Sequence, residues 1–266
     1  MLSLFNNKPL LDEGTTQWLF DAYSWALSNF GSDYFHEETI LVTPTREHFP
    51  CQVDSREAMA STVFEQVTAY AGMQNWPLKL IELTPEYDPV PPSSVVYNGI
   101  PRGTGTALTL EGETKCVEIT YTPDQTRDPG ALAAVFSHHL AGHLSQTAKT
   151  PCPGGEELEG HARDLLAIFL GFGLFLANNA IMAKGGCSGC GKSLQSLGFL
   201  PEDEMTYALA IFCVLKKIPN KEVLPHLKSA LRPLFKKAVK EIENNRAEIN
   251  RLTAIDHPLN TMLENS

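Results

Sequence analysis

The apolar segment 165–177 is the feature that most constrains the fold of this chain. It reads Leu-Leu-Ala-Ile-Phe-Leu-Gly-Phe-Gly-Leu-Phe-Leu-Ala, with Asp164 before it and Asn178-Asn179 after it. The segment is shorter than the run of about 20 apolar residues that a membrane span needs. A helix that is apolar on all sides has to be surrounded by protein. We therefore expect a central buried helix here and no membrane span.

Size and charge set the class of protein. The chain has 266 residues, of which 43% are hydrophobic and 20% charged, and these values are typical of a globular protein with a full core. Its formal net charge is −10. Binding to nucleic acid or to an anionic membrane needs clustered Lys and Arg. The basic residues over 216–240 are interleaved with acidic ones at their end and predict a solvated helix face. We therefore expect no nucleic-acid partner.

The N-terminal segment and the cysteines together predict a cytoplasmic protein. The chain begins Met-Leu-Ser-Leu-Phe-Asn-Asn-Lys, without the basic and then apolar pattern of a signal peptide. Cysteines of a cytosolic protein stay reduced. We expect this state for all six, which are Cys51, Cys116, Cys152, Cys187, Cys190 and Cys213.

The first half of the chain mixes helical and strand patterns. Gly31 is the residue type that commonly follows a helix, and a turn over 112–114 between two alternating segments indicates a hairpin. Five prolines make 84–103 a predicted loop. The predicted elements are helices at 15–30 and 54–71, the second with a capping box of Asp54 and Glu57, and strands at 39–43, 78–83, 106–111 and 115–121.

Helical patterns dominate from residue 128 onwards. Asp128-Pro129 predicts a helix start, because Asp caps helix N-termini and Pro is favoured in the first turn. The expected fold class is α+β, as a single domain over 1–266. Its α/β part, about 1–127, contributes a small sheet and helices that pack against a helical part at about 128–250. The predicted helices cover 128–146, 156–183, 202–216 and 221–247, the last with breaks at Pro225 and Pro233.

The helix predicted at 128–146 contains a group of histidines. Residues 137–144 read Ser-His-His-Leu-Ala-Gly-His-Leu, so His139 and His143 share one helical face. This is the spacing of the two metal-binding histidines in zinc peptidases, but Leu140 stands where their catalytic glutamate follows the first histidine. A pair of core histidines that hydrogen-bond to carbonyls or carboxylates is the alternative interpretation. His138 falls on a separate face, among small residues suited to close packing.

A zinc site needs a third protein ligand, and the next predicted helix offers several. The short loop before it predicts that the two helices pack as neighbours. Glu157, His161 and Asp164 lie on one face of that helix. We expect zinc to be bound by His139, His143 and His161, with His138 or Glu157 as alternative ligands and Asp164 orienting a ligand by hydrogen bonding. Glu156 and Glu159 fit better as solvated acids near the helix N-terminus.

At this point the sequence resembles a known group. Segment 135–180 is similar to uncharacterised bacterial proteins of zincin-like metallopeptidase character, which carry Ala-His-Glu-Leu-x-His, an acidic residue before Thr-Asp-Leu, and an apolar Gly-x-Gly helix. The similarity is strongest over Asp164–Asn178. It extends weakly to the Trp-rich first helix, to 39–44, and to the segments at Gly198 and Tyr207. The resemblance implies a zincin-like fold and a metallopeptidase ancestor.

The chain departs from that group where the chemistry would be. In a gap-free alignment His138 takes the first ligand position, His139 replaces the glutamate, and Gly142 replaces the second histidine. A shift by one residue restores the pair His139 and His143, and the third-ligand position falls near His161. The glutamate is lost in either register. The resemblance therefore implies weak or lost peptidase activity, with His138 and Glu157 as candidates for a displaced general base.

A second group of possible ligands lies in a glycine-rich connection. Cys187 and Cys190 form a single Cys-x-x-Cys, which fits incidental thiols, a second metal site with Cys152, or a redox pair.

Three functions follow from these patterns. The leading hypothesis is a zincin-like, zinc-binding protein with weak or lost peptidase activity and a peptide or protein partner. The alternatives are an active zinc-dependent hydrolase with a displaced base, and a metal-free interaction or structural protein.

Overall fold

The computed structural model describes residues 8–50, 53, 55–87, 94–98, 101–103, 107–111, 116–180 and 198–255. These residues are mostly helical, with two short two-stranded sheets, so the α+β class is confirmed. The helices are α1 (Glu13–Phe30), α2 (Ser32–Glu37), α3 (Arg56–Tyr70), α4 (Pro129–Ser145), α5 (Glu159–Ala167), α6 (Gly173–Asn179), α7 (Glu202–Leu215), α8 (Asn220–Val223), α9 (Leu231–Asn244) and α10 (Arg246–Thr253). The strands are β1 (Leu78–Glu82), β2 (Ser94–Asn98), β3 (Ala107–Glu111) and β4 (Val117–Tyr121).

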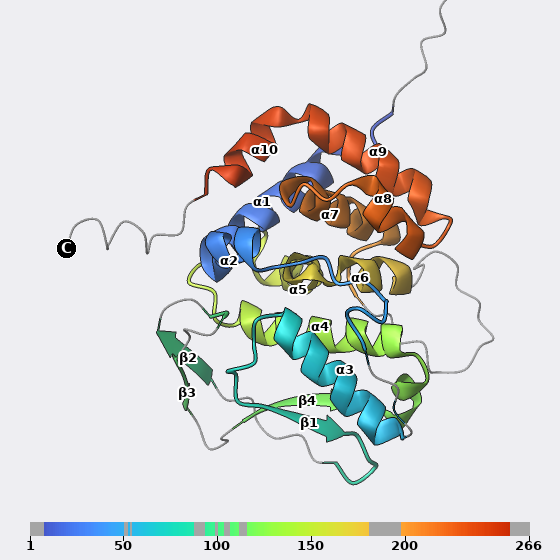
Figure 1. Cartoon of the computed structure of the whole chain (residues 1–266). Coiled ribbons are helices and arrows are strands. Elements are labelled where there is room, and N and C mark those ends of the chain that lie inside the picture. Colours follow the sequence, from blue (N-terminus) through green and yellow to red (C-terminus); the bar gives the residue numbers. More distant parts are fainter. Residues whose placement is uncertain are drawn as a thin grey trace, which may run out of the picture.

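The elements stack in layers around α5 and α6 (Figure 1). Strands β1 and β4 form one side, and α3 and α4 lie over them. Helices α5 and α6 occupy the middle, α1 and α7 follow, and α9 and α10 form the opposite side. The histidine-bearing α4 is therefore enclosed between α3, β4 and the central helices, which fixes where its side chains lie.

The central apolar segment is buried as predicted, but it does not form one continuous helix. A π-helical turn, Ile168–Phe172, separates α5 from α6, and Gly171 has φ 103° inside it. The Gly171 carbonyl accepts a hydrogen bond from the amide of Val42 at 3.0 Å. A Cβ at Gly171 would lie 2.2 Å from the carbonyl oxygen of Ile40, so only glycine permits this approach.

This broken helix is also the longest apolar one among the described residues. The stretch Gly155–Asn179 is long and apolar enough to cross a membrane by length and composition alone. However, 83% of its most apolar window is buried inside the protein. Core helices of that kind pass the same test, so the observation decides nothing about membranes and the expectation of no membrane span stays a prediction.

The pairing of the strands differs from the predicted hairpin. Strand β4 pairs in parallel with β1, with Leu80 opposite Ile119. Strand β3 pairs with β2 in an antiparallel arrangement, and β2 lies inside the predicted loop 84–103. The loop prediction was wrong for β2, because it was based on the prolines of the whole segment, whereas the sequence of β2, Ser-Val-Val-Tyr-Asn, contains no proline. The long-range parallel pair has no local turn signal at all.

Three smaller predictions also change. The segment predicted as a strand at 39–43 pairs with no strand among the described residues, and its Val42 amide donates to the Gly171 carbonyl in the helix break instead. Helix α3 is capped by the Ser55 hydroxyl, which accepts from the amide of Ala58 at 3.1 Å, whereas Asp54 lies outside the described residues. The last predicted helix does break near Pro225, but Pro233 sits within the first turn of α9 and leaves it intact.

Candidate functional site

The start of α4 follows from its local sequence. The Asp128 carboxylate accepts hydrogen bonds from the amides of Gly130 and Ala131 at 2.9 and 3.1 Å, and Pro129 is the first helical residue. This cap fixes the phase of the helix, so the three histidines of α4 point in directions set by the helical repeat. The predicted helix start is confirmed.

His138 lies against a buried carboxylate. Its Nε2 is 3.0 Å from Oδ1 of Asp164 on α5, and the Asp164 side chain is completely buried. The other oxygen, Oδ2, accepts hydrogen bonds from the backbone amides of Phe199 and Leu200. The two atoms are close, but the angles between them are outside the range of a hydrogen bond. Neither His138 Nε2 nor Asp164 Oδ1 has a hydrogen-bond partner among the described residues. The sequence predicted that Asp164 orients a metal ligand, and in the structure Asp164 lies against His138.

The neighbouring small residue on this face of α4 makes room for Arg163. A Cβ at Gly142 would lie 3.1 Å from Nε and 3.2 Å from Cδ of Arg163. The Arg163 Nε is buried without a hydrogen-bond partner, and one terminal nitrogen lies 3.5 Å from the half-exposed Glu159 carboxylate. The small-residue face thus permits the close packing that its composition predicts, and a guanidinium group fills the space beside Gly142.

His139 and His143 lie on the adjoining face and are half-buried. The pKa of His139 is lowered to about 4, mainly by burial and in addition by His138, His143 and Arg163. Burial also lowers the pKa of His143, and Arg163 adds to this. Burial has this effect because it penalises the charged imidazolium. Both rings are therefore neutral at pH 7, the state in which an imidazole binds metal or donates one N–H.

His161, the proposed third ligand, packs against aromatic residues. The His161 ring packs edge-on against Trp18, with centroids 6.2 Å apart, and is tilted against Phe199 at 5.9 Å. Its Nδ1 is buried without a partner. In the part of the chain that the structure describes, no three His, Cys, Asp or Glu side chains converge to hold a metal ion. His139, His143 and His161 are thus not brought together, and zinc binding stays a prediction.

The other candidate residues are scattered. Glu157 is exposed in the 3-10 turn Gly155–Leu158. Cys152 is half-buried and donates to the Gly155 carbonyl at 3.3 Å, and burial raises the pKa of its thiol. Cys187 and Cys190 lie outside the described residues.

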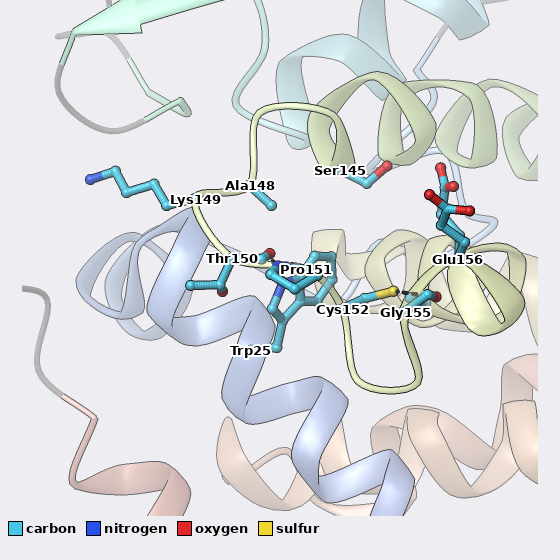
Figure 2. Close-up of a pocket in the computed structure, with 11 residues that line it drawn as sticks. Trp25, Ser145, Ala148, Lys149, Thr150, Pro151, Cys152, Gly155 and Glu156 are labelled. Atoms are coloured by element: carbon cyan, nitrogen blue, oxygen red, sulfur yellow. Dashed lines mark hydrogen bonds between the residues drawn. The ribbon is translucent and has the colours of Figure 1, made fainter.

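A cavity that the sequence did not reveal adjoins the end of α4. It has a volume of about 370 Å³ and is lined by Trp25, Ser145, Ala148, Cys152, Glu159 and Ala162, among others. Figure 2 shows the Trp25 ring next to Pro151 in its wall. The Trp25 indole donates to the Thr150 carbonyl at 2.9 Å, which holds the loop in place. The only sequence signal was a loop rich in Pro and Gly after the histidine helix.

Comparison of the chain with protein-family models, with curated proteins and with solved structures gives no significant match.

Proposed function

We propose that this chain is a zincin-like domain that has lost metal-dependent peptide hydrolysis and functions by binding a peptide or protein. The observation that carries the proposal is the side chain of Arg163 packed against Gly142, one helical turn from His138. In the gap-free alignment with the zincin-like group, Gly142 replaces the second metal-binding histidine. A fixed positive charge thus lies beside the position from which a zinc ligand is missing.

The residues present do not complete a catalytic zinc site on this face. Such a site takes three protein ligands and leaves one position for water. His138 Nε2 and Asp164 Oδ1, 3.0 Å apart, would supply two of them. The guanidinium of Arg163, which packs against Gly142, would repel a metal cation bound on this face. The glutamate that would activate a metal-bound water is replaced by His139.

The same side chains have a structural effect without metal. Asp164 holds the backbone at Phe199 and Leu200 and lies against His138, so it joins α4, α5 and the segment that leads into α7. The arrangement keeps the helices of a metallopeptidase-like centre in place. The glutamate base that activates water in the resembled group is also replaced, by His139, which supports a role in binding.

The test is to rebuild the missing site. Purified wild-type protein should contain no stoichiometric zinc by elemental analysis and should not hydrolyse peptides. The variant H139E/G142H/R163T restores the motif of the resembled group and removes the competing cation, so we expect about one zinc per chain. The matched control H139E/G142A/R163T lacks only the restored ligand and should stay free of zinc. One zinc in the wild type, together with chelator-sensitive hydrolysis, would refute the proposal.

A second candidate function, zinc binding without hydrolysis at His139 and His143, is favoured by one observation. Both imidazoles are half-buried with lowered pKa values, so they are neutral and available as ligands at pH 7. A third ligand from His161, His138 or Glu157 would require side chains to move. Elemental analysis of the wild type beside H139A/H143A tests this candidate. If zinc is bound at His139 and His143, the wild type contains zinc and the double variant does not.

A further inference from the structure

We propose that the exposed Phe199 ring, with the acidic helix starts beside it, binds a basic segment of a partner protein that also carries an apolar side chain. The aromatic residues Trp18, His161 and Phe199 form the centre of this site, which we name the Phe199 surface. We rest this on the proposed function for one premise, that the chain acts by binding a peptide or protein. The Phe199 surface adds the chemistry of that partner.

Phe199 is an exposed aromatic residue that is held in a fixed position. It is 58% exposed. Its amide donates to Oδ2 of the fully buried Asp164, as does the amide of Leu200 at 2.8 Å. A Cβ at Gly160 would lie 2.6 Å from the Phe199 ring, so the ring lies directly on the backbone of α5. An aromatic residue that is already fixed loses little conformational entropy on binding, and such residues carry much of the energy of protein interfaces.

His161 and Trp18 extend the apolar surface beside Phe199. The His161 ring lies 5.9 Å from the Phe199 ring and 6.2 Å from the Trp18 ring, measured between centroids. Both residues are half-buried. The Trp18 indole donates to the Pro153 carbonyl at 2.9 Å, so its position is fixed as well. The row of rings suits an apolar side chain, and the face of an aromatic ring also attracts Lys and Arg cations.

Carboxylates flank the Phe199 surface from two helix starts. On one side, three acidic residues form the first turn of α7. The first of them follows Phe199 by three residues, so their Cα atoms are at most about 11 Å apart. On the other side, acidic residues of the turn Gly155–Leu158 and the start of α5 precede Gly160, on which the ring lies. These carboxylates are Glu156, Glu157, Glu159, Glu202, Asp203 and Glu204.

Most of these carboxylates lack a cation. Among the described residues, Glu159 is the one of the six that forms an ion pair, with Arg163 at 3.5 Å. The pKa of Glu204 is raised to about 7, mainly by burial and in addition by Asp203 and Asp12. Acids in a first turn stabilise their own helix, but this does not explain an exposed ring between two such turns. A cation of a partner would reduce the repulsion among the carboxylates.

The charge of the Phe199 surface disfavours two other kinds of partner. Nucleic acids and anionic membranes would be repelled by these carboxylates and by the net charge of −10. A second copy of this chain, paired about a two-fold axis, would bring the same carboxylates against one another. A segment with Lys or Arg fits instead, because its cations can pair with the carboxylates while its apolar side chain packs against Phe199.

The test measures peptide binding by fluorescence anisotropy. The probe is fluorescein-labelled Lys-Leu-Lys-Phe-Lys-Leu-Lys, and its controls carry Glu in place of Lys, or Ser in place of Leu and Phe. We expect the first peptide alone to bind. F199S should weaken binding by roughly ten-fold or more, whereas F199L, which keeps an apolar side chain, should retain most of it. I40S is the matched control, because Ile40 is also an exposed large hydrophobic residue, at 42%.

A second set of variants tests the carboxylates. E202Q/D203N/E204Q should weaken binding of the basic peptide and reduce its dependence on salt, because exposed charges are screened by ions. E37Q/E47Q/E65Q removes the same number of charges at exposed positions outside the Phe199 surface and is the matched control. Circular dichroism shows whether each variant keeps its helices.

The outcomes separate the Phe199 surface from the proposed function. Equal binding of the acidic peptide, or unchanged affinity in folded F199S, would overturn the basic partner. Self-association that F199S abolishes, without peptide binding, would show that a second copy is the occupant. Absence of binding in zinc-free wild type would also overturn this site and leave the proposed function standing. Zinc with chelator-sensitive hydrolysis, beside chelator-resistant binding that F199S weakens, would refute the proposed function and leave the Phe199 surface.

Discussion

The histidines on two faces of helix α4 have different surroundings. On one face His138 lies against the fully buried Asp164, whose second oxygen is held by two backbone amides. On the other face His139 and His143 are half-buried, and burial is the main cause that lowers the pKa of each ring. The first face stabilises the packing of the helices, whereas the second carries two neutral, half-buried rings.

The comparison shows that spacing alone does not identify a metal site. Among the described residues, the histidine of α4 that forms an ion pair with a carboxylate is His138, and not His139 or His143, the pair with the spacing expected of metal ligands. Predictions for the two faces therefore differ in size and in kind, and mutations can test each face separately.

The largest expected effect is the loss of Asp164. We expect D164A to lower the free energy of unfolding by about 3–5 kcal/mol, because it removes the acceptor of the buried Leu200 amide and of the part-buried Phe199 amide, and the carboxylate against His138. Urea unfolding followed by circular dichroism measures this. H139A, on the other face, should cost much less, and D164N is the matched variant that retains an oxygen for the Leu200 amide. Equal losses in D164A and H139A would mean that the two faces do not differ.

The second effect is a dependence of the free energy of unfolding on pH that arises from His139. The pKa of His139 is lowered from 6.5 to about 4, so the unfolded chain binds its proton first as the pH falls. Stability should therefore decrease between about pH 6.5 and pH 4, by up to roughly 3 kcal/mol from this group. H139Q should flatten that slope in unfolding titrations, and H226Q, in the turn before α9, should leave it unchanged. An unchanged slope in H139Q would show that His139 is not the group responsible.

Sequence reasoning succeeded where the signals were local. Asp128 and Pro129 determine where α4 begins, and the apolar segment 165–177 forms the buried centre. The strand pairs failed because their partners are distant in sequence: β1 pairs with β4 across a long intervening segment. The break at Gly171 was also invisible, since it depends on the approach of the Ile40 carbonyl from another part of the chain.

The candidate site follows the same rule. The face shared by His139 and His143 was predictable from helical spacing, and a histidine-orienting role for Asp164 from its place near the apolar segment. Which histidine Asp164 meets depends on how α4 and α5 pack, and the close approach of Arg163 to Gly142 belongs to the same packing. His161 was placed among the ligands by helical phase. Its contacts with Trp18 and Phe199 come from segments that no local pattern connects to it.

The smallest effect tests whether Arg163 couples to the open face. R163Q removes a nearby positive charge, so the pKa of His139 and of His143 should rise towards the ordinary value. Because burial is the larger cause in both, the rise should be modest. Histidine ring signals followed by NMR against pH measure it. His36, whose pKa is lowered by burial and by Lys216, is an internal control that should not respond. If the pKa of neither His139 nor His143 changes while the fold is intact, the charge of Arg163 does not act on these rings.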